Sequence, residues 1–170
     1  GDDPGASTAI ELVADNAVLS NGAQIATASI GAGAAGAIQL SVRDTVQISG
    51  VDSTLSPSSI SSTSGSGGHG GDIFVESSRV TLIEGGRISS LGFAEGVGGN
   101  VTVNADTVLV AGASVGGAPS SIQTQTLSAA GGTVSVNASS VMVDTLGLIQ
   151  TLTNDSGSAG DLTVTATDMV

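Results

Sequence analysis

The stretch DIFVESSRVTLIEGGRISSLGFAEGVGG, residues 72–99, decides the fold. It contains three short segments, DIFVES, RVTLIEGG and RISSLG, in which apolar and polar residues alternate, and it ends in a glycine-rich return. A period of two is typical of a β-strand that turns one face toward a core. Three such segments in 28 residues therefore predict one coil of a parallel β-solenoid.

The same pattern recurs along the chain of 170 residues. The repeats begin at Ile10, Ile38, Ile73, Val101, Val134 and Leu162. The spacings between these starts are 28, 35, 28, 33 and 28 residues. Repeats of this length indicate stacked units that bury a core jointly. We therefore predict an all-β fold in which residues 1–170 form a single β-solenoid segment, with about six coils of three short strands each.

Stacked coils place equivalent residues above one another, at the strand spacing of about 4.7–4.8 Å. The repeat starts form one apolar column. The expected core ladder of a second face consists of Ile25, Ile60, Ile88, Ile122 and Ile149. A third apolar column consists of Val80, Val108, Val141 and Met169. Polar columns are expected as well, with Asn104 above Asn137 as an amide ladder. The polar residues that follow a glycine at one corner are Asp72, Asn100, Thr133 and Asp161.

Two coils carry a six-residue insertion at the same corner. Twelve positions separate the apolar residues at 48 and 60, and those at 110 and 122, whereas six separate those at 82 and 88. Both insertions end in Pro-Ser-Ser-Ile, at residues 57–60 and 119–122, so the larger repeat is a pair of coils, one plain and one with a loop. Loops on a rigid scaffold usually carry recognition. The candidate contact residues are Val51, Asp52, Ser53, Thr54, Leu55, Ser56 and Pro57 in the first loop, and Val115, Gly116, Gly117, Ala118 and Pro119 in the second.

Three segments resemble a known family. They are Asn21-Gly22-Ala23-Gln24-Ile25, Gly85-Gly86-Arg87-Ile88 and Gly99-Asn100-Val101-Thr102-Val103. These segments are similar to the repeats of filamentous haemagglutinin-like exoproteins, the adhesins of two-partner secretion systems in Gram-negative bacteria, including cyanobacteria. The resemblance covers about residues 9–170. It implies a right-handed parallel β-helix, secretion through an outer-membrane partner, and work as an adhesin or surface filament.

Composition and charge exclude several classes of function. The chain has three basic residues, all Arg, against 15 Asp and Glu, and its net charge is -12. Phosphate backbones would repel it, so we expect no nucleic-acid partner. No run approaches the roughly 18 apolar residues that span a bilayer, so we expect no membrane insertion. Without Cys there is neither a disulfide scaffold nor a structural zinc site.

Motifs that could bind a cofactor or a metal are weak. Residues 31–36 and 65–70 match G-x-G-x-x-G, but each leads into a predicted strand instead of a helix, so we interpret both as return turns. His69 lies in the second stretch, with Ser66 and Asp72 near it in the sequence, and such a turn lacks the rigidity of a catalytic triad. We expect no catalytic residue and no cofactor. Calcium binding stays open, because acidic residues lie in turns without forming an RTX pattern.

Three hypotheses for function follow. The first is a structural segment of an extracellular fibre or adhesin, on the outer surface of a Gram-negative or cyanobacterial cell. It would be an interior slice of a longer array, stack with itself, and contact a host or neighbouring-cell surface or a matrix. The second is a polysaccharide-active β-helix enzyme, although the chain has no Tyr or Trp for sugar stacking. The third is binding to ice or a crystal surface through threonine ladders such as Thr124 and Thr151. These threonines share the parity of the isoleucine ladder, which favours an internal hydroxyl ladder.

Overall fold

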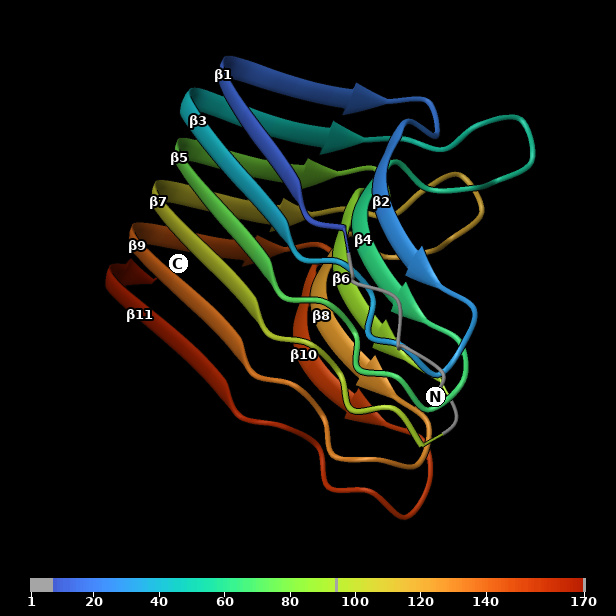
Figure 1. Ribbon diagram of the computed structural model, residues 1–170. Helices are drawn as coiled ribbons and strands as arrows, with labels where there is room; N and C mark the ends of the chain where they lie inside the picture. The colour runs from blue at the N-terminus through green and yellow to red at the C-terminus, as the bar shows by residue number, and fades with distance from the viewer. Residues whose placement is uncertain (1–7, 94, 170) are drawn as a thin grey trace.

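The computed structural model describes residues 8–93 and 95–169, and every regular element in this part of the chain is a β-strand. The strands form two parallel sheets (Figure 1). The six-stranded sheet contains, in spatial order, β1 (Ile10–Ser20), β3 (Ile38–Ser49), β5 (Ile73–Ile83), β7 (Val101–Ala111), β9 (Val134–Asp144) and β11 (Leu162–Met169). The five-stranded sheet contains β10 (Leu148–Thr153), β8 (Ser121–Thr126), β6 (Arg87–Gly92), β4 (Ser59–Ser64) and β2 (Gln24–Ser29). This all-β arrangement is consistent with the predicted β-solenoid.

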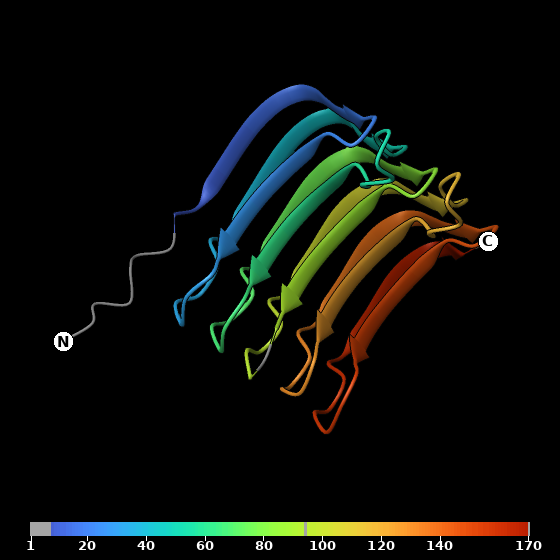
Figure 2. The same cartoon turned by 90° about the vertical axis from the view of Figure 1, so that its right-hand side faces the viewer.

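The strands stack in sequence order, and the glycine-rich returns gather along one edge of the stack (Figure 2). Each strand of the six-stranded sheet from β1 to β9 is followed by a short strand of the other sheet, and the next long strand pairs with the previous one. Among the described residues no helix is both long enough and apolar enough to cross a membrane.

Each repeat contains two strands where the sequence predicts three. The segments DIFVES and RVTLIEGG belong to the single strand β5, which bends midway without leaving the sheet (Figure 1). Its pairing with β7 continues through the bend, from Ser77 opposite Ala105 to Arg79 opposite Thr107. At the bend Ser78 and Arg79 are both exposed, so the alternation slips by one residue. That slip resembles a strand boundary in the sequence, but the hydrogen-bonded ladder does not end there.

The predicted register is confirmed along both sheets. The repeat starts pair with one another from Ile10 to Leu162. The isoleucine ladder is continuous, with Ile60 opposite Ile25 and Ile88, and Ile122 opposite Ile88 and Ile149. The third predicted column is confirmed too, because the backbones of Val80, Val108, Val141 and Met169 pair in succession. The inward side chains of both sheets form one apolar core, in which Ile60, Ile88 and Ile122 have no exposed surface.

The two longer spacings in the sequence have separate structural causes. Both long repeats contain the inserted loop. The spacing of 35 also includes a bulge, because β3 has 12 residues where β5 has 11, and the register shifts between Ser41 and Thr45. The spacing of 33 has a shorter return, since eight positions separate Thr126 from Val134 whereas nine separate Gly92 from Val101. The stack therefore absorbs small changes of length at the bend and at the return.

A column of glycines closes each repeat against the one before it. Its members are Gly36, Gly71, Gly99, Gly132 and Gly160. A Cβ atom at Gly71, Gly99, Gly132 or Gly160 would overlap the carbonyl oxygen of the preceding glycine in the column. Only glycine permits this close approach of two backbones. The glycine content of the returns is therefore a packing requirement of the stack. The sequence also aligns residues 3–10 with residues 155–162, which predicts a return turn at the start of the chain, but residues 1–7 lie outside the described residues.

Candidate functional site

The two inserted loops project from the same corner of the stack, beyond the tight turns of the other repeats (Figure 1). The first connects β3 to β4, and the second connects β7 to β8. Each is closed at its base by an antiparallel bridge, between Val51 and Pro57 in the first and between Ala113 and Pro119 in the second. We call residues 51–57 the first loop and residues 113–119 the second loop. The second loop begins two residues before the predicted Val115, and the predicted residues of both loops lie within these segments.

Both loops adopt one backbone conformation although their sequences differ. In the first loop the N–H of Asp52 donates to the carbonyl of Ser56, and the N–H of Leu55 donates to the carbonyl of Asp52, both at 3.0 Å. The second loop repeats both bonds at the equivalent positions, each at 2.8 Å. Leu55 and its counterpart Gly117 have positive φ angles, 67° and 80°. The shared conformation therefore includes a residue in the region that favours glycine.

The Asp52 carboxylate organises the first loop. Its Oδ1 atom accepts hydrogen bonds from the Thr54 hydroxyl at 2.7 Å, the Thr54 N–H at 2.7 Å and the Ser56 N–H at 2.9 Å. The hydroxyl bond from Thr54, followed by the two backbone bonds, lowers the pKa of Asp52 below its ordinary value of 3.8. In the second loop the uncharged Ser114 stands at this position and accepts from the N–H of Ala118 at 3.2 Å. Only the first loop therefore depends on an ionised side chain.

Each loop is seated on the tight turn of the preceding repeat. The Ser58 hydroxyl accepts from the N–H of Gly22 at 2.9 Å and donates to the carbonyl of Ser49 at 2.7 Å. Ser120 makes the equivalent contacts at 3.0 and 2.7 Å, the first of them to Gly85. A Cβ on Gly22 would lie 2.6 Å from the Cβ of Asp52, so this turn must carry glycine. The predicted Pro-Ser-Ser-Ile motif thus contains the serine that fixes each loop to its neighbour.

The third tight turn carries Leu146 where the other two carry glycine. Leu146 has a positive φ of 67° and is largely exposed. No inserted loop packs on this turn among the described residues. In the other two turns, a Cβ atom at this position would overlap Asp52 above Gly22 and Ser114 above Gly85.

The loops present apolar side chains to solvent. Leu55 is 55% exposed and Val115 is 91% exposed. The two loops lie close together, since a Cβ atom built on Gly116 would lie 3.3 Å from Cδ1 of Leu55. Each loop thus carries an aliphatic tip near the other. The predicted role of this surface in contact with a partner stays a prediction.

The threonine and serine ladder of the five-stranded sheet is internal. Its members are Thr27, Ser62, Ser90, Thr124 and Thr151. Ser90 is typical, because its hydroxyl accepts from the N–H of Gly99 at 3.1 Å and donates to the carbonyl of Gly71 at 3.0 Å. Thr124 donates to the carbonyl of Gly132 at 2.8 Å and has no exposed surface. These hydroxyls join the short strands to the glycine returns and do not form an outward array that could meet a crystal surface.

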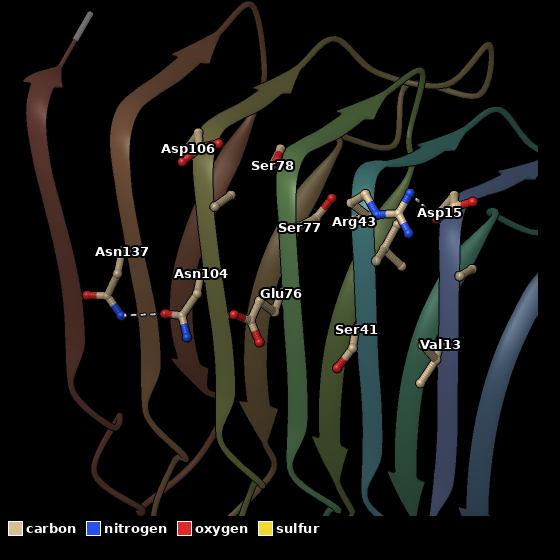
Figure 3. Close-up of a pocket in the computed structure, with 13 residues that line it drawn as sticks. Val13, Asp15, Ser41, Arg43, Glu76, Ser77, Ser78, Asn104, Asp106 and Asn137 are labelled. Atoms are coloured by element: carbon tan, nitrogen blue, oxygen red, sulfur yellow. Dashed lines mark hydrogen bonds and ion pairs between the residues drawn. The ribbon is translucent and has the colours of Figure 1, made fainter.

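A groove of about 920 Å³ crosses the long strands at their bend, and sequence reasoning missed it (Figure 3). We call it the cross-strand groove. The residues of its first edge are Val13, Ser41, Glu76, Asn104 and Asn137, each from a different strand of the six-stranded sheet. The residues of its second edge are Asp15, Arg43, Ser78 and Asp106. Between the two edges lie Ala14, Val42, Ser77 and Ala105, of which Val42 and Ser77 are buried. The groove thus runs along the stacking direction, across the strands.

The edges of the groove offer hydrogen-bonding groups of several kinds. Asn137 donates to the Oδ1 atom of Asn104 at 3.0 Å, which confirms the predicted amide ladder. Arg43 and Asp15 form an ion pair at 2.9 Å in which both side chains are well exposed. Glu76 and Asp106 make no ion pair among the described residues. After the Arg43–Asp15 pair is counted, the groove keeps two carboxylates and no unpaired basic group.

The glycine-rich motifs lie in the return segments, as interpreted from the sequence. His69 lines a second, smaller cavity of about 460 Å³ at these returns, together with Asp72, Asn100 and several glycines. The carbonyl of His69 accepts from the N–H of Ala35 at 2.9 Å, which joins two repeats. Asp72 accepts from the N–H and the side-chain amide of Asn100, at 2.7 and 3.1 Å. In residues 8–93 and 95–169, no three His, Cys, Asp or Glu side chains gather so that they could hold a metal ion.

Comparisons with known proteins found no matching family model, no similar curated protein and no similar solved structure. The resemblance to filamentous haemagglutinin-like repeats therefore rests on the sequence segments that carry it. By their geometry, two surfaces are candidates for function: the paired loops and the cross-strand groove.

Proposed function

We propose that this chain is a structural segment of an extracellular fibre or adhesin, as its resemblance to filamentous haemagglutinin-like exoproteins implies. In this proposal it is a right-handed parallel β-helix of about six coils with a two-coil super-repeat. The stack serves as a rod on the outer surface of a Gram-negative or cyanobacterial cell. The paired loops are its contact surface for a host or neighbouring-cell surface or a matrix.

The shared conformation of the two loops is the observation that carries this proposal. Their sequences differ at every position of residues 51–56 and 113–118, yet both loops keep the same bridge, the same two backbone hydrogen bonds and the same seat on the preceding turn. A loop held in one conformation loses little conformational entropy when it binds. A fixed backbone with variable side chains is therefore suited to contact and recognition.

The end strands support the second part of the proposal, stacking with further coils. β1 and β11 end the six-stranded sheet, and β2 and β10 end the five-stranded sheet. At these ends Ile25 and Ile149 are only half-buried, whereas the ladder members between them are fully buried. Open strand edges are templates for further pairing. A further coil, from the same chain or from a second copy, would bury the end isoleucines.

The test replaces each loop by a plain turn. The tripeptide Glu-Gly-Gly of residues 84–86 replaces residues 50–58 and, separately, residues 112–120. The flanking apolar residues are then six positions apart, as they are in the plain repeat. Fluorescent beads coated with the parent chain or with the loopless variant are then applied to epithelial cells and to biofilm matrix. We expect beads with the parent chain to be retained and beads with the loopless variant to be washed away. A control variant, Thr81→Ala, alters an outward side chain elsewhere and should keep the parent behaviour.

Two results would contradict the proposal. Equal retention of parent and loopless beads would remove the loops as the contact surface. Failure of parent beads to bind either surface would remove adhesion as the role. Electron microscopy of the parent chain tests the stacking separately, because self-stacking predicts rods that lengthen with protein concentration, whereas compact particles of one size at all concentrations would refute it.

A further inference from the structure

The five short strands form a sheet without acidic residues. None of the 15 Asp and Glu residues lies in β2, β4, β6, β8 or β10, whereas each strand of the six-stranded sheet contains at least one. The one charged residue in the short strands is Arg87, the first residue of β6. Ile88 is fully buried in the core, so the alternation of the strand turns Arg87 to the outer side of the sheet. A single cation therefore lies on an otherwise uncharged face.

Arg87 lies between the bases of the two inserted loops. β6 is flanked by β4 and β8, the strands that follow the first and the second loop (Figure 1). The N–H of Arg87 donates to the carbonyl of Ser58 at 3.1 Å, and the N–H of Ser121 donates to the carbonyl of Gly86 at 3.0 Å. The neighbours of Arg87 in register are Ser59 and Ser121, which are both short and buried. Arg87 is therefore the long side chain of this row, between the two loops.

The guanidinium of Arg87 has no acidic partner. Its Nε atom is shielded from solvent and makes no hydrogen bond. Within residues 8–93 and 95–169 the ion pair joins Arg43 to Asp15, and Arg87 forms none. A donor that is shielded from water without an acceptor destabilises a fold, and buried donors in native structures nearly always have one. An acceptor brought to this guanidinium by a binding partner would relieve that cost.

The acidic residues nearest to this position in the loop and the turn limit what can bind. The Oδ1 atom of Asp52 already accepts three hydrogen bonds within the first loop. The carboxylate of Glu84 lies at the base of that loop, since a Cβ on Gly50 would lie 3.9 Å from its Oε2 atom. One isolated carboxylate can pair with Arg87, whereas a polyanion would bring further negative charges toward Asp52 and Glu84.

We propose that Arg87 binds the carboxylate of an Asp or Glu side chain in a protein segment that docks on the paired loops. The inference rests on the proposed role of the loops as a contact surface, and it names the chemistry of their partner. The planar fork of a guanidinium matches the two oxygens of a carboxylate. The exposed side chains of Leu55 and Val115 supply apolar contacts for the residues that flank the carboxylate. Arginine is one of the residue types enriched at the energetic centres of protein interfaces.

The experiment follows the Nε–H signals of the arginines by NMR, since the chain has three arginines and each gives one signal. The probes are acetyl-Leu-Glu-Leu-amide and acetyl-Leu-Gln-Leu-amide, which differ in the charge of one side chain. We expect the Glu peptide to shift the Arg87 signal with a dissociation constant on the order of 1 mM. The Gln peptide should bind about tenfold more weakly, because the charge-assisted hydrogen bonds are lost.

Three variants separate the fork of Arg87 from charge alone. Arg87→Gln removes the cation, and Arg87→Lys keeps the charge without the fork. Both should bind the Glu peptide about tenfold more weakly than the parent, as measured by the backbone amide shifts of the two loops. The matched control is Arg79→Gln, which removes an exposed arginine of the other sheet and should bind as the parent does.

Four outcomes would overturn the inference. Equal shifts of the Arg79 and Arg87 signals would show general attraction to cations. Equal binding of the Glu and Gln peptides, or equal binding by the Arg87→Gln and Arg79→Gln variants, would remove the carboxylate contact. Tighter binding of trigalacturonate or inorganic phosphate than of the Glu peptide would show an anionic glycan or a simple anion as the ligand. Beads with Arg87→Gln that are retained on epithelial cells as the parent beads are would also refute it, while leaving the loops as the contact surface.

Discussion

Replacing Gly99 by alanine tests the stacking directly. Gly99 lies in the glycine column, and its N–H donates to the buried Ser90 hydroxyl at 3.1 Å. An added Cβ would overlap the carbonyl oxygen of Gly71 and lie 2.5 Å from that of Gly70. Both obstacles are backbone atoms, so neither can rotate aside. The variant must either separate two repeats or distort the return.

The expected loss in the free energy of unfolding follows from this geometry. Inserting a methyl group into a well-packed site costs about 1–3 kcal/mol, and occasionally more. Because backbone must move on both sides, we expect a loss of about 3 kcal/mol or more for Gly99→Ala. For a chain of this length that loss lowers the midpoint of thermal unfolding by about 6–12 °C. The free energy is measured by urea unfolding with linear extrapolation, with the slope checked against the parent.

Gly31→Ala is the matched control. A Cβ on Gly31 meets no atom within 4 Å, and Gly31 is not among the glycines with a positive φ. The same substitution should therefore leave stability unchanged or raise it by about 0.4–1 kcal/mol, through the unfolded chain. If Gly99→Ala unfolds within about 0.5 kcal/mol of the parent, as an ordinary surface substitution does, the repeats are not packed as closely as described. The reasoning on the glycine column would then fail.

Three further predictions concern single side chains. Because the folded pKa of Asp52 is lowered, its stabilising contribution is complete above the ordinary value of 3.8 and is lost as the pH falls through the folded value. Amide shifts of the first loop should change in that acid range while those of the second loop, with Ser114, stay constant; equal changes in both loops would contradict this. Thr124→Val removes the hydroxyl that donates to the buried carbonyl of Gly132, so the free energy of unfolding measured in urea should fall by about 1–3 kcal/mol. An unchanged free energy of unfolding would contradict this prediction. Arg43→Ala removes an exposed ion pair and should change stability by at most about 1 kcal/mol, so a loss above twice that value would show a structural role.

The register of the stack could be predicted from the sequence because it depends on a simple regularity. Each repeat places an isoleucine, valine or leucine at the same inward position, and shifting a strand by one residue would turn these side chains outward. The two inserted loops could also be predicted from the sequence, because the Pro-Ser-Ser-Ile motif occurs twice, 62 positions apart. The bridge that closes the second loop begins at Ala113, two residues before the candidate contact residue Val115. Ala113 and Ser114 share no residue type with Val51 and Asp52, although they have the same roles in the backbone.

The bend of the long strands was beyond sequence reasoning. Two adjacent outward residues, such as Ser78 and Arg79, are equally compatible with a break between strands and with a bend within one strand. Hydrogen bonds to the neighbouring repeats decide between the two, and periodicity does not report on them. The cross-strand groove lies at this bend. Apart from Val13, its edge residues are polar and look like ordinary solvent-facing positions when each strand is considered alone.

The seating of each loop on the turn before it fixes the distance from one loop to the next. The loops belong to alternate repeats, so about two strand spacings, roughly 9–10 Å, separate equivalent atoms. A partner with two matching epitopes at that distance would engage both loops without any linker to order. The second contact would then be intramolecular, with a high effective concentration, and weak individual contacts would add up to strong avidity.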